Sequence, residues 1–162
     1  MLKHLLLLPI TMLLAGAWVQ NASPAGFDPA KPTAIDAERS EWFDGGSRII
    51  LEEGVQISQP GIILTADQME IEFVPGTQEI KQLTAIGRVR YATADGNAIA
   101  GDRALYSGSE ALLTVTGNVV VVQQTQVATG DQLIYNTETG AIRMTGGEEG
   151  RVRALITPQE GV

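Results

Sequence analysis

The chain has no cysteine, and its single histidine is His4, close to the amino terminus. The absence of cysteine excludes a disulfide framework and a thiol nucleophile. Because His4 falls in a segment that we expect to be removed, the rest of the chain has no imidazole base. The serines have no partner base, and the chain contains no G-x-S-x-G motif. We therefore expect no catalytic residue and no enzymatic activity.

Aromatic residues and positive charge are also scarce. Phe, Trp and Tyr together make up 5% of the chain, and its formal net charge is −8 at pH 7. A surface of this charge repels nucleic acid, so we expect no nucleic-acid partner. Residues 95–97 (Asp-Gly-Asn) lack the spacing of a calcium-binding loop, and a hairpin turn explains them better. No glycine motif that cradles phosphate is present, so no metal and no cofactor are expected.

The first 17 residues have the three parts of a cleavable signal peptide. Lys3 and His4 form a short basic region, residues 5–14 are an apolar stretch, and residues 15–17 (Ala-Gly-Ala) supply a small-residue cleavage site. The apolar stretch is shorter than the roughly 20 residues that a membrane-spanning helix needs. We therefore predict export, with a signal peptide over 1–17. An uncleaved membrane anchor is the alternative.

Beyond this segment, apolar residues recur with period two. Residues 68–73 (Gln-Met-Glu-Ile-Glu-Phe) alternate polar and apolar, and residues 87–91 do the same. Turn signals such as Pro75-Gly76 separate these runs. The pattern predicts an all-β chain of about a dozen or more short antiparallel strands. Residues 18–32 and 158–162 lack this periodicity, and we expect a flexible lead-in and a tail there.

A short block recurs four times: an acidic residue followed, four positions later, by a large apolar residue. The pairs are Glu38 and Trp42, Asp67 and Ile71, Asp102 and Tyr106, and Asp131 and Tyr135. The acids lie 29, 35 and 29 residues apart, which is typical of a stacked repeat architecture. Glycine-led apolar strands alternate with these blocks and contain Val55, Val89 and Val119. We expect each acid to end a strand or to brace a corner by accepting backbone N–H bonds.

Some apolar runs exceed what one buried face needs. Residues 119–122 are four consecutive valines, and residues 62–64 and 49–51 are similar. One explanation is a strand that is buried on both faces. The other is that one face packs on protein and the other lines a groove that holds acyl chains. Both explanations stay open from the pattern alone.

The blocks at residues 65–71, 101–106 and 129–136, with the glycine-led link at 116–121, closely resemble the OstA-like domain of the LptA family. The resemblance covers residues 33–157. It implies a V-shaped antiparallel β-jellyroll with a hydrophobic interior groove that is built from repeats. It also implies a periplasmic protein that carries lipopolysaccharide by its lipid A chains and bridges the inner and outer membranes. The implied partners are LptC-like inner-membrane and LptD-like outer-membrane proteins, joined by edge-strand addition, and homo-oligomers at high concentration.

The period-two apolar residues are the expected lining of such a groove. They are Val55, Ile57, Met69, Ile71, Phe73, Val89, Tyr91, Val119, Val121, Leu133, Tyr135, Ile142 and Met144. The open ends of the sheet are the expected partner edges, around Ile35 and Trp42 at one end and Val152, Ala154 and Ile156 at the other. Two alternatives remain: a polymer-forming β-solenoid scaffold with a dry interior, and another OstA-fold component of the same pathway, similar to LptC.

Overall fold

The structure is a computed structural model that describes residues 27–146 and 150–156. The predicted signal peptide over 1–17, residues 18–26 of the lead-in and the tail over 158–162 lie outside the described residues. The described part contains ten strands and one short 3-10 helix. In chain order they are β1 (Ala34–Asp36), β2 (Arg39–Phe43), η1 (Asp44–Gly46), β3 (Arg48–Gln59), β4 (Ile62–Phe73), β5 (Ile80–Thr93), β6 (Ala98–Ser107), β7 (Leu112–Gln123), β8 (Gln126–Asn136), β9 (Ile142–Thr145) and β10 (Arg153–Ile156).

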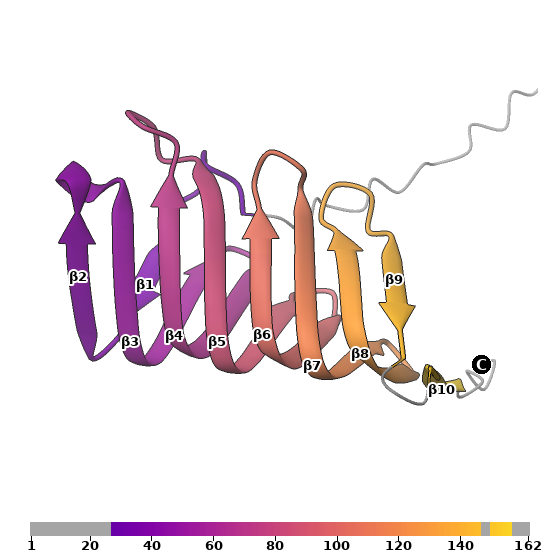
Figure 1. Cartoon of the computed structure of the whole chain (residues 1–162). Coiled ribbons are helices and arrows are strands. Elements are labelled where there is room, and N and C mark those ends of the chain that lie inside the picture. Colours follow the sequence, from indigo (N-terminus) through magenta and orange to yellow (C-terminus); the bar gives the residue numbers. More distant parts are fainter. Residues whose placement is uncertain (1–26, 147–149, 157–162) are drawn as a thin grey trace, which may run out of the picture.

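All ten strands belong to one antiparallel sheet that is folded into two leaves (Figure 1). Residues 48–52 of β3 pair with β2 and with the end of β4, whereas residues 55–59 pair with β1 and with the start of β4. Strands β4 to β8 cross between the leaves in the same way. We call the leaf that contains β2 and β9 the front leaf, and the leaf that contains β1 and β10 the rear leaf. The all-β antiparallel fold predicted from the sequence is confirmed, and it is open rather than a closed barrel.

The leaves join at a line of irregular residues that we call the bend. The register between neighbouring long strands shifts there in every pair from β3–β4 to β7–β8. On the glycine-led strands two consecutive residues have left-handed φ values: 79° and 46° at Gly87 and Arg88, and 78° and 47° at Gly117 and Asn118. This conformation suits glycine, and it turns the strand from one leaf into the other. The opposite edges of the leaves, where the hairpin turns lie, form the mouth of the fold.

The four repeated acids all lie at the bend. Glu38 separates β1 from β2, and its backbone N–H donates to the Glu53 carbonyl oxygen at 3.1 Å. Asp67 accepts a hydrogen bond of 2.8 Å from Nε of Arg88, and Oδ2 of Asp102 accepts one of 2.8 Å from Nδ2 of Asn118. Asp67 and Asp102 therefore brace the corner, but their donors are side chains on the next strand, not the backbone N–H groups predicted.

The prediction of a dozen or more short strands was wrong in strand length. Strands β3 to β8 are each 10 to 14 residues long. The reason is the bend, which interrupts the alternation. In β4 the buried positions step by three residues, from Ala66 to Met69, and in β5 they step by four, from Ala85 to Val89. Each half of a bent strand therefore looks like a separate short strand in the sequence.

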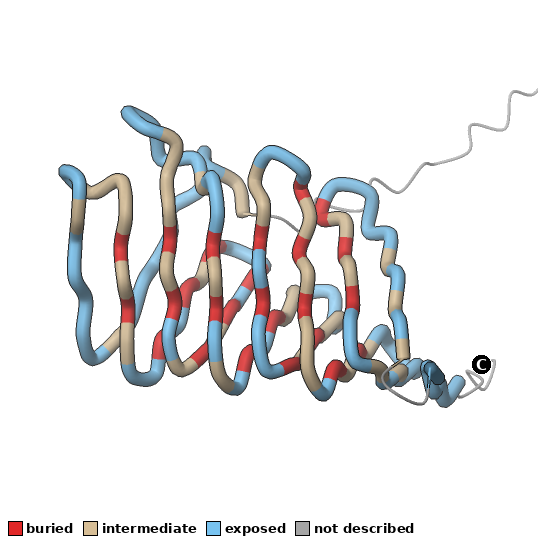
Figure 2. Tube along the Cα trace, in the orientation of Figure 1, coloured by how far each residue is buried: buried red, intermediate tan, exposed pale blue. Residues whose placement is uncertain are grey.

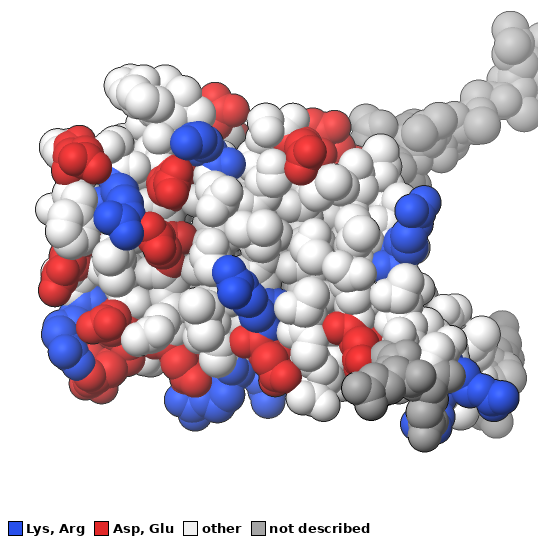
Figure 3. Space-filling model, viewed as in Figure 1, with Lys and Arg blue, Asp and Glu red and all other residues white. Residues whose placement is uncertain are grey.

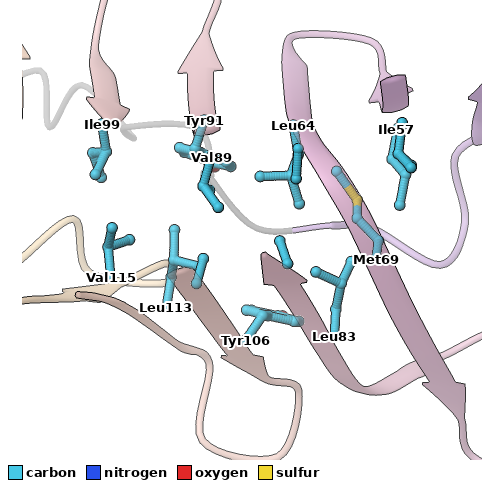
Figure 4. Packing of buried hydrophobic residues seen from close by; sticks show 14 of the residues in the cluster. Ile57, Leu64, Met69, Leu83, Val89, Tyr91, Ile99, Tyr106, Leu113 and Val115 are labelled. Carbon is cyan, nitrogen blue, oxygen red and sulfur yellow. The ribbon is translucent and has the colours of Figure 1, made fainter. Parts of the chain in front are cut away.

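The core lies between the leaves, where the inward side chains of both meet (Figures 2 and 4). Leu51, Met69 and Leu133 of the front leaf and Val55 and Val89 of the rear leaf are each at most 2% exposed. Burial of one such side chain contributes about 1.5–3 kcal/mol. Because the long strands contribute inward residues to both leaves, the apolar interior is continuous along β3 to β8.

Candidate functional site

The structure places all thirteen predicted lining residues in the interior between the leaves. Ten of them belong to the buried core, and Phe73, Ile142 and Met144 are partly buried and pack against it. The six from β3, β5 and β7 lie on the rear leaf, and the seven from β4, β8 and β9 lie on the front leaf. The periodicity thus identified one inward surface that both leaves share.

The predicted lining list left out about as many interior residues as it contained. The large residues that it left out are Ile49, Leu51, Ile62, Leu64, Leu83, Ile99, Tyr106, Leu113 and Val115. Residues 49–51 and 62–64 had been noted as apolar runs, and Tyr106 as part of a repeated block. A signal for several of them was present, because Leu83 and Ala85, and likewise Leu113 and Val115, alternate with polar residues. These pairs lie just before the bend on glycine-led strands. Because the bend interrupts the alternation, the sequence did not show which face of the sheet they occupy.

An elongated cavity of about 650 Å³ lies along the mouth of the fold. Its interior wall includes Ile49, Ile57, Ile71 and Tyr106, and it extends to Thr137 after β8. At its other end it reaches the first two strands, where Ile35 and Trp42 also border it. A mostly apolar space of this size is within the range of ligand pockets. It is continuous with the buried core, since several of its lining residues belong to both.

Residues 27–33, which we call the strap, lie over this cavity. Oε1 of Gln59 accepts a hydrogen bond from the backbone N–H of Asp28 at 2.9 Å, and Nε2 of Gln59 donates to the carbonyl oxygen of Asp28 at 3.0 Å and to Oγ1 of Thr33 at 2.7 Å. The Phe27 ring lies edge-on to the Tyr106 ring, with centroids 6.2 Å apart. The described part of the predicted lead-in has no strand, yet it is held at both leaves, by Gln59 of the rear leaf and Tyr106 of the front leaf.

All three tyrosines of the chain lie near the mouth. Tyr91 is two residues from the end of β5 on the rear leaf, and Tyr106 and Tyr135 are each one residue from the end of a front-leaf strand. The Tyr91 and Tyr135 ring centroids are 6.2 Å apart. Burial raises the pKa of all three hydroxyls above the ordinary value of 10.0, and a hydrogen bond with the Thr137 side chain partly lowers the pKa of Tyr106. The three groups therefore stay neutral at physiological pH.

In the part of the chain that the structure describes, the side-chain geometry forms no metal site. Among those residues no three His, Cys, Asp or Glu side chains are placed to hold a metal ion. The repeated acids are spread along the bend on alternate strands, so they do not come together in one place. No helix among the described residues is long and apolar enough to cross a membrane.

The predicted partner edges lie at the two ends of the sheet. At the amino-terminal end, β1 and β2 each pair with β3 on one side only, and Ile35 and Trp42 are 39% and 63% exposed. At the carboxyl-terminal end β10 pairs with β8 and, among the described residues, with no other strand. Val152, Ala154 and Ile156 are exposed. This end also presents β9, which pairs with β8 on the front leaf and was not predicted as an edge.

These features together define an open, folded antiparallel sheet with a shared apolar interior. The family described as "LptA/(LptD N-terminal domain) LPS transport protein" matches residues 34–141. The chain therefore belongs to this family of lipopolysaccharide transport proteins.

A solved structure supports the same fold. It is LptH, the LptA homologous periplasmic component of the conserved lipopolysaccharide transport device from Pseudomonas aeruginosa. The two structures superpose with a TM-score of 0.71 at 15% sequence identity, over 81% of this chain and 99% of LptH. No curated protein sequence matches the chain.

Proposed function

We propose that the protein is a non-enzymatic periplasmic carrier of lipopolysaccharide that holds lipid A acyl chains between its two leaves. The observation that carries this proposal is the apolar interior, which runs along the sheet from β3 to β9 and meets a cavity at the mouth. Each CH₂ group transferred from water to such an interior contributes about 0.8 kcal/mol. A few partly buried acyl chains therefore outweigh the repulsion between lipid phosphates and an acidic protein.

The fold is suited to opening at the mouth. In the described residues the strand pairing that joins the leaves runs through the bend, and across the interior the contacts are between side chains. Side-chain packing separates without the loss of strand hydrogen bonds, whereas the bend keeps the leaves together. The interior supplies no directional force, so movement of lipid needs an energy-consuming partner elsewhere.

The test is direct binding of lipid A to the protein purified from the periplasm. Ile71→Arg and Val121→Arg place a charge in the interior, and we expect each to reduce binding at least tenfold. The matched control is Ile63→Arg, because Ile63 lies on β4 but is 46% exposed. Circular dichroism checks that each variant is folded. Binding by the wild type should change little with salt, since burial of acyl chains dominates.

Three results would contradict parts of this proposal. A folded wild type that shows no lipid A binding at micromolar concentration would favour the scaffold with a dry interior. Equal loss of binding in the Ile63→Arg control would place the lipid on the outer surface of the sheet. Recovery of the full-length chain in the membrane fraction after a high-salt wash would instead favour an anchored, LptC-like component.

We further propose that each end of the sheet pairs with a domain of the same fold, and that the joined domains form a bridge across the periplasm. These domains are other copies of this chain and its LptC-like and LptD-like partners. Among the described residues the two ends differ in net charge: Asp36, Glu38 and Glu41 outnumber Arg39 on or beside β1 and β2. Arg143, Arg151 and Arg153 lie on or beside β9 and β10, and Figure 3 shows mixed charge at the first end and positive charge at the second. Opposite charges favour head-to-tail over head-to-head pairing. Such a heterologous contact extends into a filament instead of closing as a dimer.

Removal of residues 151–162 tests the bridge. The truncated protein should stay folded and bind lipid A, but should lose concentration-dependent association in sedimentation experiments. The matched control shortens the chain only to residue 156 and keeps β10. A truncated protein that forms the same oligomers and still binds its outer-membrane partner would place the interface elsewhere.

A further inference from the structure

The hydroxyl of Tyr91 is a polar group in the apolar interior that has no hydrogen-bond partner among the described residues. Tyr91 is 4% exposed, and its strand neighbours on the inner face of the rear leaf are Leu64 and Ile99. The nearest ring across the interior is that of Tyr135. A buried hydroxyl without a partner is rare in folded proteins and destabilises them. This observation points to a partner that binds in the interior.

The position of Tyr91 indicates what that partner is. Tyr91 lies two residues inside the mouth end of β5, which at the rise of a strand places it about 7 Å below the rim. Deeper inward positions on the same strand, such as Val89, are apolar. A lipid that inserts its chains between the leaves and keeps its headgroup outside would hold the linkage between the two parts at the level of Tyr91. That linkage is a carbonyl group in an acylated lipid, and a carbonyl oxygen accepts the hydrogen bond that a tyrosine hydroxyl donates.

We propose that Tyr91 determines specificity for acylated lipids, its hydroxyl donating a hydrogen bond to the carbonyl oxygen of the ester or amide that joins an acyl chain to its headgroup. The proposal rests on the proposed function, and it names the part of the lipid that the protein distinguishes. An alkyl chain of equal length without the carbonyl would fill the same apolar space and leave the Tyr91 hydroxyl unpaired. Burial keeps this hydroxyl protonated, so that it remains a donor.

The experiment compares two ligands that differ in one carbonyl group. They are 1-tetradecanoylglycerol, an ester, and 1-O-tetradecylglycerol, the matching ether, each measured by displacement of a fluorescent alkyl probe from the whole periplasmic protein. The wild type should bind the ester about five- to tenfold more tightly, as one net hydrogen bond predicts. Tyr91→Phe should lose this preference and keep its affinity for the ether. Thr84→Val is the matched control, because it removes a hydroxyl from the outer face of the same strand, and it should keep the wild-type preference.

A second readout needs no ligand. Tyr91→Phe removes an unpaired hydroxyl, so its thermal unfolding midpoint without ligand should equal or exceed that of the wild type. A Tyr91→Phe protein that keeps the preference for the ester, or a wild type that binds both ligands equally, would overturn the role of Tyr91 and leave the lipid-carrier function standing. A wild type that binds neither these ligands nor lipid A would overturn both.

Discussion

The bend and the mouth of this folded sheet are built on different principles. At the bend, small residues allow close approach: a Cβ atom added at Gly87 would lie 2.9 Å from Cγ of Asp67, and one added at Gly117 would lie 2.9 Å from Cβ of Asp102. At the mouth, by contrast, there are large side chains, a cavity and a strap that is held by side-chain hydrogen bonds. The bend is fixed by steric constraint and backbone conformation, and the mouth by contacts that can be exchanged.

This difference suits the proposed carrier, which would open at one side only. Changes at the bend should act on folding, whereas changes at the mouth should act more on ligand binding and local opening. Local stability varies across proteins in this way, and the elements that move for binding belong to the less stable parts. Substitutions at the bend and at the mouth therefore separate the two contributions.

Gly87→Ala should cost about 2–4 kcal/mol of unfolding free energy, measured by denaturant titration, because it combines a left-handed φ of 79° with contact against Asp67. Gly96→Ala is the matched control: its φ is 86°, but a Cβ there meets nothing within 4 Å, and it should cost only about 1–2 kcal/mol. In an Asp67→Gly background the additional cost of Gly87→Ala should fall toward that of the control. If the two alanine variants lose the same unfolding free energy, the contact with Asp67 does not contribute to the stability of the bend.

The sequence allowed the bend and the inward face to be predicted because both leave a periodic signal. The acids recur on alternate strands, at Glu38, Asp67 and the two later positions. Their spacing is nearly constant because the strands have about the same length. Alternation in residues 68–73 assigned Met69, Ile71 and Phe73 to one face, and the structure places all three inward. What the pattern could not give was the continuity of each strand through the bend.

The strap was beyond sequence reasoning for a different physical reason. Residues 27–33 have no periodicity, and their position depends on Gln59, whose side chain reaches Asp28 across 31 positions of the sequence. A polar residue at the mouth end of β3 looks like an ordinary strand end. The unpaired hydroxyl of Tyr91 could not be predicted from the sequence either. The period of two predicts that the side chain is buried, but it gives no information about its hydrogen bonds.

Gln59→Ala should cost about 1–3 kcal/mol, because it removes the three hydrogen bonds that hold the strap at the rear leaf. The effect should be local to the mouth, with much faster hydrogen exchange at the Asp28 amide and little change for amides at the bend. Gln56→Ala, at an exposed position of the same strand, is the control and should change neither. Uniformly faster exchange in the Gln59 variant would show that the strap is part of the global folding unit.

The tyrosines of the mouth should make the protein sensitive to alkali. Burial raises the folded-state pKa of Tyr91 above the unfolded value of 10.0, so its contribution to stability is complete below pH 10 and is lost as the pH rises above it. At pH 11 this one group should account for a loss of about 1.4 kcal/mol relative to pH 9. Tyr91→Phe should lose less stability over the same interval. If the variant loses as much stability between pH 9 and pH 11 as the wild type, other groups cause the sensitivity to alkali.

Asn118→Gly should change the unfolding free energy by only about 0.5 kcal/mol or less, although it removes the hydrogen bond from Nδ2 to Asp102 at the bend. The reason is that Asn118 has a φ of 47°, and glycine adopts this left-handed conformation without the steric cost that other residues bear. The gain from relieved backbone strain should nearly offset the loss of an exposed hydrogen bond. Asn118→Ala loses the bond and keeps the strain, so it should cost about 1 kcal/mol. Denaturant titration of the two variants separates these contributions: if glycine is as destabilising as alanine, the bend depends on the hydrogen bond to Asp102, and the backbone conformation of its residues is secondary.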